Sequence, residues 1–282
     1  MRIVFVHGIN NQSNSSEWIA RDWANFIERA INKPGLLAGC DVVAPFYGKR
    51  LAELTRDRDM TVRDAVAQSA TGVPDADVEF AESLVGEIAA GLGVDTADVE
   101  AAADLDVTTM TPGVRALLPT LALIERWSPG TGDFVMRFVK EANTYFRGIG
   151  AKDEIDALVK PALTGHGSQI VIGHSLGSVV TFDLLRNNAT DTRLYVTLGS
   201  PLPLASVQRQ LGPPLRQPSA VRRWLNAIDP DDVVGLGRGL VPPFAIGIEN
   251  LTDLRNGWDS HSIRGYLSDA RVANAIATAL SC

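Results

Sequence analysis

The chain has 282 residues, of which 45% are hydrophobic, so it can fill a sizeable core as one large α/β domain or two small ones, and we expect a soluble globular protein. Its 26 Lys and Arg residues against 33 Asp and Glu residues give a formal net charge of -7, and since no basic cluster interrupts this balance, we expect no nucleic-acid partner. Cys40 and Cys282 do not make a disulfide framework, which fits a reducing compartment, and we predict a cytoplasmic protein.

The opening segment predicts a strand rather than a signal peptide, because MRIVFVHGI has one basic residue, a short apolar run and no small-residue cleavage site. The longest helical apolar stretch, 113–124, contains Arg115 and Pro119 and falls short of the roughly 20 residues that a bilayer requires. We therefore expect no transmembrane segment.

Six short β-branched runs, bounded by Gly, Pro, Asn or Asp, predict strands. The first four are continuous apolar runs, as expected of strands that are buried on both faces of a parallel sheet. In chain order the runs are RIVFVHG from Arg2, DVVAPFYG from Asp41, QIVIGHS from Gln169, RLYVTLGSP from Arg193, RRWLNAID from Arg222 and, with a weaker pattern, AIGIENL from Ala245.

Helical patterns lie between most of these runs, which predicts crossover connections and a mostly parallel sheet. Residues 15–31 place apolar side chains at helical spacing, with Ser15 or Ser16 as the N-cap. Residues 151–163 predict the crossover helix that leads into the third strand. The sequence thus favours one α/β domain over residues 1–282.

Residues 49–150 separate the second and third strands by far more chain than one crossover helix needs, which predicts an insertion. The insertion has helical patterns at 60–70, 75–93, 95–104, 112–127 and 132–147. Apolar residues from Phe134 to Phe146 form one stripe. We expect the insertion to cover the site described below, and the alternative is an arm that binds a partner protein.

The pentapeptide GHSLG places Ser175 between Gly173 and Gly177, after an apolar run and before a helical pattern. This order predicts a nucleophile elbow, a strand-turn-helix in which the serine has a strained backbone and only very small residues fit two positions away. The alternative is a glycine-rich turn that contains a serine.

A serine nucleophile requires a base, which in this pattern follows both the serine and an acid along the chain. Of the four histidines, only His261 lies beyond Ser175 in the chain. His7 and His166 both precede the predicted strand that leads to the serine. His174 adjoins the serine, and its side chain is expected to point away from the substrate. His261 is therefore the predicted base, and a plain surface-loop histidine is the alternative.

The segment NAIDPDDVVG supplies three candidates for the acid that orients the base. Asp232 is favoured, since it is followed by two valines that can pack while the carboxylate projects from the loop. Asp229 is the second choice, because it stands at the strand end, where it could instead cap the turn, and Asp231 is expected to be solvated.

An oxyanion needs two N–H donors. The backbone N–H of Leu176, immediately after the serine, is one. The loop after the first strand offers the N–H of Ile9, with Gly8 allowing a close backbone approach. The alternative is that this loop is only a polar turn.

Taken together, the segments VFVHGINNQ, VIGHSLGSVV, VTLGSPLPL, WLNAIDPDDVV and DSHSIRGYL resemble the α/β-hydrolase superfamily, in its lipase and serine-esterase branch. The resemblance covers the first 48 residues and nearly everything after residue 150. It implies an α/β-hydrolase fold, with a mostly parallel sheet of about six strands that starts at the family's third strand, flanked by helices. It implies no cofactor and no metal.

The sequence thus predicts a serine hydrolase that cleaves carboxylic esters through an acyl-enzyme, acting on a small-molecule or lipid-like ester. An amidase, peptidase or thioesterase would use the same residues, and a non-catalytic binding module is the alternative from another class. Calcium-loop, dinucleotide-turn, Walker and paired-histidine zinc patterns all fail on spacing.

Overall fold

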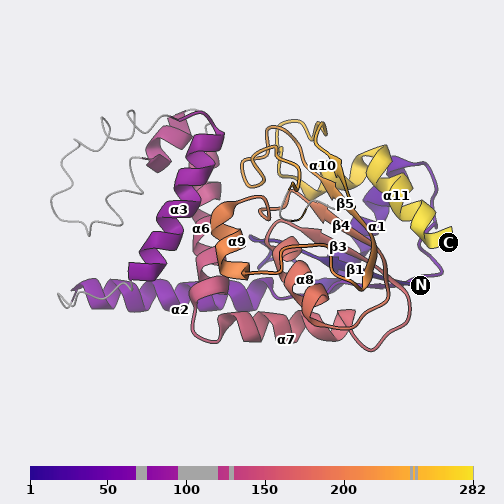
Figure 1. Cartoon of the computed structure of the whole chain (residues 1–282), viewed down its shortest axis with the longest axis horizontal. Helices are drawn as coiled ribbons and strands as arrows, with labels where there is room; N and C mark the ends of the chain where they lie inside the picture. The colour runs from indigo at the N-terminus through magenta and orange to yellow at the C-terminus, as the bar shows by residue number, and fades with distance from the viewer. Residues whose placement is uncertain (68–74, 95–119, 127–129, 242–243, 245–246, 282) are drawn as a thin grey trace.

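The prediction of an α/β fold with a parallel sheet is confirmed by a computed structural model, which describes residues 1–67, 75–94, 120–126, 130–241, 244 and 247–281 (Figure 1). Six strands form one sheet in the order β2-β1-β3-β4-β5-β6, and every pair is parallel. The strands are β1 (Arg2–Val6), β2 (Asp41–Val43), β3 (Gln169–His174), β4 (Thr192–Leu198), β5 (Val221–Ala227) and β6 (Ile248–Leu251).

The central strands are apolar at successive positions because each face of the sheet has its own core. In β1, Ile3 and Phe5 belong to one hydrophobic cluster, and Val4 and Val6 belong to the other. This alternation follows from the two-residue period of a strand. The continuous apolar runs at β1, β3 and β4 therefore describe strands covered on both sides, but the same prediction is wrong for β2, which lies at the sheet edge and is only partly buried.

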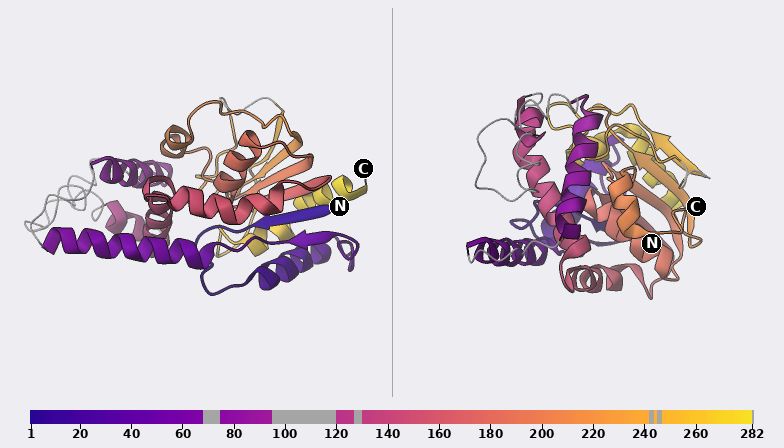
Figure 2. Two further views of the ribbon diagram at one scale, coloured as in Figure 1. Left: turned by 90° about the horizontal axis from the view of Figure 1, so that it is seen from below. Right: turned by 60° about the vertical axis from the view of Figure 1, so that its left-hand side comes forward.

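One face of the sheet is covered by α1 (Ser16–Ala30), α10 (Ile263–Ser268) and α11 (Ala270–Ser281). The opposite face is covered by α7 (Ala151–Leu163), α8 (Leu176–Asn187) and α9 (Ala205–Leu211). Figure 2 shows α1 and α7 on opposite sides of β1. Ser15 is the N-cap of α1 and accepts a 3.2 Å bond from the Trp18 N–H, as predicted for Ser15 or Ser16.

The inserted segment is helical in the described residues, with α2 (Gly48–Ala67), α3 (Asp75–Gly91), a helical stretch at 120–126 and α6 (Thr131–Arg147). These helices gather at one end of the sheet in Figure 1. The first helix begins at Gly48, whereas the sequence predicted a start near Met60. The prediction missed this first part because residues 49–59 are rich in charged side chains and show no clear apolar period. The helix predicted at 95–104 lies outside the described residues, as do residues 112–119 and 127 of the helix predicted at 112–127.

Apolar side chains of α3 and α6 join the same cluster as the sheet residues beneath α8. Phe80, Leu84 and Phe138 belong to this cluster together with Val4 and Val179. An ion-pair network adds polar contacts, since Asp77 on α3 pairs with Arg58 of α2 and Arg147 of α6. The described part of the insertion is thus packed against the sheet rather than separate from it.

Within the described residues, none of the helices combines the length and the apolar character needed to cross a membrane.

Candidate active site

Ser175 stands in the turn between β3 and α8 with φ 53° and ψ -131°, a backbone conformation that is strained for a residue with a side chain. Each neighbouring glycine has a steric reason. A Cβ on Gly173 would lie 2.6 Å from Thr181 Oγ1, and a Cβ on Gly177 would lie 2.3 Å from the His7 carbonyl oxygen. The turn therefore requires glycine on both sides of the serine.

Hydrogen bonds with Leu198 and Ser178 fix the backbone of Ser175. Its N–H donates to the Leu198 carbonyl at 3.0 Å, and its own carbonyl accepts from Ser178 Oγ at 2.6 Å. A Cβ on Gly8, after β1, would come within 2.4 Å of Ser175 Cβ. The Ser175 hydroxyl itself is buried and has no hydrogen-bond partner among the described residues.

His261 and Asp232 form a buried hydrogen-bonded pair. The Nδ1 atom of His261 lies 2.8 and 2.9 Å from the two carboxylate oxygens of Asp232. Asp232 also accepts a 2.5 Å bond from the Tyr266 hydroxyl and a 2.9 Å bond from the Val234 N–H. Burial acts to raise the pKa of Asp232, but the charge and hydrogen bond of His261, with these two donors, hold it below its usual value. The acid is therefore an anion at neutral pH.

Gly199, at the end of β4, makes room for this pair. A Cβ there would lie 2.7 Å from Asp232 Oδ2 and 3.0 Å from His261 Nδ1, and the residue has φ +52°. Both the space and the backbone conformation favour glycine.

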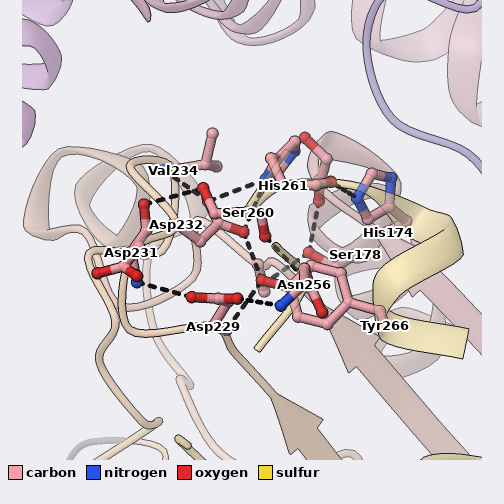
Figure 3. A network of polar contacts seen from close by, with 12 residues as sticks. His174, Ser178, Asp229, Asp231, Asp232, Val234, Asn256, Ser260, His261 and Tyr266 are labelled. Carbon is pink, nitrogen blue, oxygen red and sulfur yellow. Dashed lines mark hydrogen bonds and ion pairs between the residues drawn. The ribbon is translucent and has the colours of Figure 1, made fainter. Parts of the chain in front are cut away.

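The other two aspartates of the segment shape the loop instead (Figure 3). Asp229 is buried and accepts from the backbone N–H groups of Asp231 at 2.8 Å and Asn256 at 2.5 Å. Asp231 is exposed, with Arg255 at 3.5 Å. Among the three, only Asp232 is bonded to His261 in the described structure.

Two aromatic side chains hold the ring of His261. His174 lies with its ring centroid 4.7 Å away, and its Nε2 bonds the His261 carbonyl oxygen at 2.9 Å. Phe134, on α6 of the insertion, packs on the ring at 5.1 Å. The Nε2 atom of His261 is buried and, like the Ser175 hydroxyl, has no partner in the described part of the chain.

The loop after β1 is held by a second buried histidine. His7 Nδ1 lies 2.8 Å from the Gly8 carbonyl oxygen, so this nitrogen carries the proton, and Nε2 accepts from the Tyr47 N–H at 3.2 Å. The Tyr47 ring stacks on His7 at 4.2 Å, and its hydroxyl bonds the His7 carbonyl. Asn11 donates to the carbonyl of Ile9 at 2.8 Å. The position of the Ile9 backbone is therefore strongly constrained.

Leu176 is the first residue of α8, where backbone N–H groups have no acceptor within the helix and the helix dipole favours negative charge. The sheet order places β1 between β2 and β3, so connections from β1 and β3 diverge at their carboxyl ends, the usual place for a ligand in an open parallel sheet. This switch point is where Gly8 meets Ser175.

The five residues predicted from the sequence thus lie in two buried groups at the carboxyl ends of the strands. One group is Ile9, Ser175 and Leu176, and the other is Asp232 with His261. Sequence reasoning missed Tyr266, which has no motif, and Phe134, which was read only as part of an apolar stripe. It expected His174 to point away from the substrate and did not predict that this side chain bonds and packs on His261. No local pattern predicts either contact, because the partners are 87 and 127 residues apart in the sequence.

Comparisons with models of protein families, with curated proteins and with solved structures find no match to this chain. Among the described residues, no group of three or more His, Cys, Asp or Glu side chains is arranged to hold a metal ion. The chemistry of the site therefore has to be argued from its own geometry.

Two of the buried histidines, His7 and His174, predict a loss of stability in acid, and burial lowers the pKa of His7 to about 4. Burial lowers the pKa of His174 to about 3, and the charge of His261 adds to this shift. Because the folded state resists a proton that the unfolded state accepts below about 6.5, the stabilisation is complete above that pH and is lost as the pH falls toward 3. When the pH falls from 7 to 4.5, the free energy of unfolding should decrease in both proteins. The decrease should be roughly 2–3 kcal/mol smaller in His174→Gln than in wild type.

Urea unfolding at the two pH values measures this difference. The control is His166→Gln, because His166 is exposed and bonds only the Pro161 carbonyl in the described structure. An equal acid loss in wild type and both variants would show that His174 carries no such penalty.

Proposed function

We propose that this protein is a serine hydrolase with an α/β-hydrolase fold that cleaves carboxylic esters. The observation that carries the proposal concerns two buried reactive atoms. Ser175 Oγ and His261 Nε2 are both without a partner among the described residues, while Asp232 holds the opposite nitrogen of the His261 ring. A donor and an acceptor left open in a buried site are costly, and catalysis gives a reason for them.

His174 links the surroundings of Ser175 with those of His261. This residue adjoins the serine, and its ring lies 4.7 Å from the ring of His261. The chain order Ser175, Asp232, His261 is that of α/β-hydrolases, and the six-stranded parallel sheet is compatible with that fold. The strained turn supports the assignment of a nucleophile elbow, since it lifts the serine away from the sheet.

In the proposed reaction, Ser175 Oγ attacks the acyl carbon of the ester while His261 Nε2 accepts the hydroxyl proton. The Asp232 carboxylate keeps the other proton of the ring on Nδ1 and stabilises the imidazolium. The N–H groups of Leu176 and Ile9 receive the negative oxygen. His261 returns the proton to the leaving alcohol, and water then cleaves the acyl-enzyme by the same steps in reverse.

The helical insertion is proposed to cover the site and to contact the acyl group. Phe134 touches His261, and Ile9 and Leu176 belong to the same apolar cluster as Leu121 and Phe138 of the insertion. Such walls favour an apolar acyl chain over a polar one. An amide or thioester could use the same machinery, because the leaving group is not selected by these residues.

The cytoplasmic location is part of the proposal, because two cysteines in 282 residues do not make a disulfide framework.

Replacing the nucleophile tests the proposal directly. Ser175→Ala should lower ester hydrolysis by a thousandfold or more with little change in stability, because the hydroxyl forms no bond in the described structure. A serine-directed phosphonate should label wild type at Ser175 alone. The matched control is Ser206→Ala on α9, which removes another buried hydroxyl without a described partner and should leave rate and labelling intact. Full activity in Ser175→Ala would refute the proposal.

The two buried aspartates should differ sharply in their effect on turnover. Asp232→Asn removes the charge that holds His261, and kcat should fall by about 10²–10⁴. Asp229→Asn keeps a carbonyl oxygen for one of the loop N–H groups, and kcat should change by less than about tenfold. Steady-state kinetics of the two variants decide the matter, and the reverse ranking would move the acid to the end of β5.

Shortening the aromatic contact from the insertion should alter substrate choice. Phe134→Ala should shift KM and acyl chain-length preference severalfold, while the fold survives, because Phe134 is only partly buried. Phe146→Ala is the matched control, since Phe146 is a partly buried residue of the same helix that packs on Phe80. If neither change affects the kinetics of any ester but oligomeric state changes, the insertion is an interface and not a cover.

A further inference from the structure

The hydroxyl of Tyr266 reaches the acid of the site from within the core of the protein. Tyr266 lies on α10, shortly after His261 in the chain, and its side chain is fully buried. Its ring belongs to the hydrophobic cluster under α1, together with Ile19 and Trp23. A Cβ on Gly199 would lie 3.0 Å from its Cε2 atom. Because the ring is packed on several sides, the hydroxyl has a fixed position.

The partners of this hydroxyl decide the direction of its two hydrogen bonds (Figure 3). Its oxygen accepts from the Asp229 N–H at 3.0 Å, and the hydroxyl proton is left to donate to Asp232 Oδ2 at 2.5 Å. Burial and the charge of Asp232 raise the pKa of Tyr266, so the tyrosine keeps this proton at neutral pH. The donor to Asp232 is therefore present throughout the pH range of an ordinary assay.

Two donors hold the Asp232 carboxylate, one on each oxygen. Tyr266 donates to Oδ2, and the Val234 N–H donates to Oδ1 at 2.9 Å. Together they oppose rotation about the terminal torsion of the aspartate, which is broad in the absence of such bonds. The Nδ1 atom of His261 lies 2.8 and 2.9 Å from the same two oxygens. The carboxylate is thus fixed with both oxygens facing the imidazole.

We propose that Tyr266 is a positioning residue, whose hydroxyl holds the Asp232 carboxylate in the orientation that faces His261 Nδ1. The inference rests on the proposed function for its effect on rate, but not for its effect on the contact between Asp232 and His261. A phenylalanine would fill the same space in the core, yet the carboxylate would then be free to turn and the imidazole would lose part of its support. A misplaced base acts on the transition state more than on substrate binding, so kcat should fall and KM should not.

The first test compares Tyr266→Phe with wild type in steady-state kinetics. We expect kcat to fall about tenfold with KM within about twofold, since the carboxylate is loosened and not removed. The matched control is Tyr145→Phe, which also removes a buried tyrosine hydroxyl that donates to a carboxylate, that of Asp156 at 2.9 Å, and should leave kcat unchanged. Wild-type kcat in Tyr266→Phe, or an equal loss in the control, would overturn the inference.

The second test separates the bond to Asp232 from the bond to the Asp229 N–H, because Tyr266→Phe removes both. In an Asp232→Asn background the carboxylate is already gone, so adding Tyr266→Phe should lower kcat by less than about twofold. If the two losses multiply instead, Tyr266 supports the loop in general and does not act through Asp232, and the inference is wrong.

A third readout does not depend on activity. The proton on Nδ1 of His261, bonded to Asp232, should give a downfield proton NMR signal that is lost in His261→Gln. This proton should exchange with water severalfold faster in Tyr266→Phe than in wild type or Tyr145→Phe, since the pair is held less firmly. Equal exchange in all three proteins, or no such signal in wild type, would contradict the proposed positioning.

The exchange measurement also separates the inference from the proposed function. If wild type hydrolyses no ester and is not labelled at Ser175, the proposed function fails, and the exchange comparison alone then supports or overturns the role of Tyr266 in holding Asp232 against His261.

Discussion

The constraint on which the site depends is the close approach of the loop after β1 to the turn after β3. The two strands are hydrogen-bonded neighbours, and their connections leave the sheet in different directions because β2 lies on the far side of β1. Gly8 and Gly177 are the points of contact, where any side chain would collide with Ser175 or with the His7 carbonyl. This approach sets the serine hydroxyl next to the loop that carries Ile9, at the carboxyl ends of β1 and β3. Everything else in the site is arranged around it.

The second part of the site is a polar network that joins the loops after β5 and β6 (Figure 3). Tyr266 accepts from the Asp229 N–H and donates to Asp232, so one hydroxyl connects the loop's structural aspartate with the one that holds His261. A buried network of this kind is stable only when its members are satisfied. The Nε2 atom of His261 is an exception, because it has no hydrogen-bond partner among the described residues, whereas the side chains of Asp229, Asp232 and Tyr266 around it are all hydrogen-bonded.

The insertion contributes to the site from above the same edge. Its helix α6 places Phe134 on the ring of His261, so the insertion contacts the residue proposed as the base. Apolar residues of α3 and α6 share a cluster with the sheet, and movement of this helix would therefore carry an energetic cost. Contact with His261 gives the insertion a direct physical route to influence the chemistry, beyond shaping a pocket.

The sequence by itself determined the parallel sheet, because each strand is a short apolar run whose successive residues must be buried on opposite faces. It also determined the order Ser175, Asp232, His261 and the need for Gly173 and Gly177, since these follow from chain order and local sterics. It ranked Asp232 above Asp229 but could not decide between them. Only the tertiary structure decided which carboxylate meets the imidazole, and it alone showed the contacts of Tyr266, His174 and Phe134. These are contacts between residues far apart in the chain, and their strength and protonation come from burial, a property of the folded molecule that no local pattern encodes.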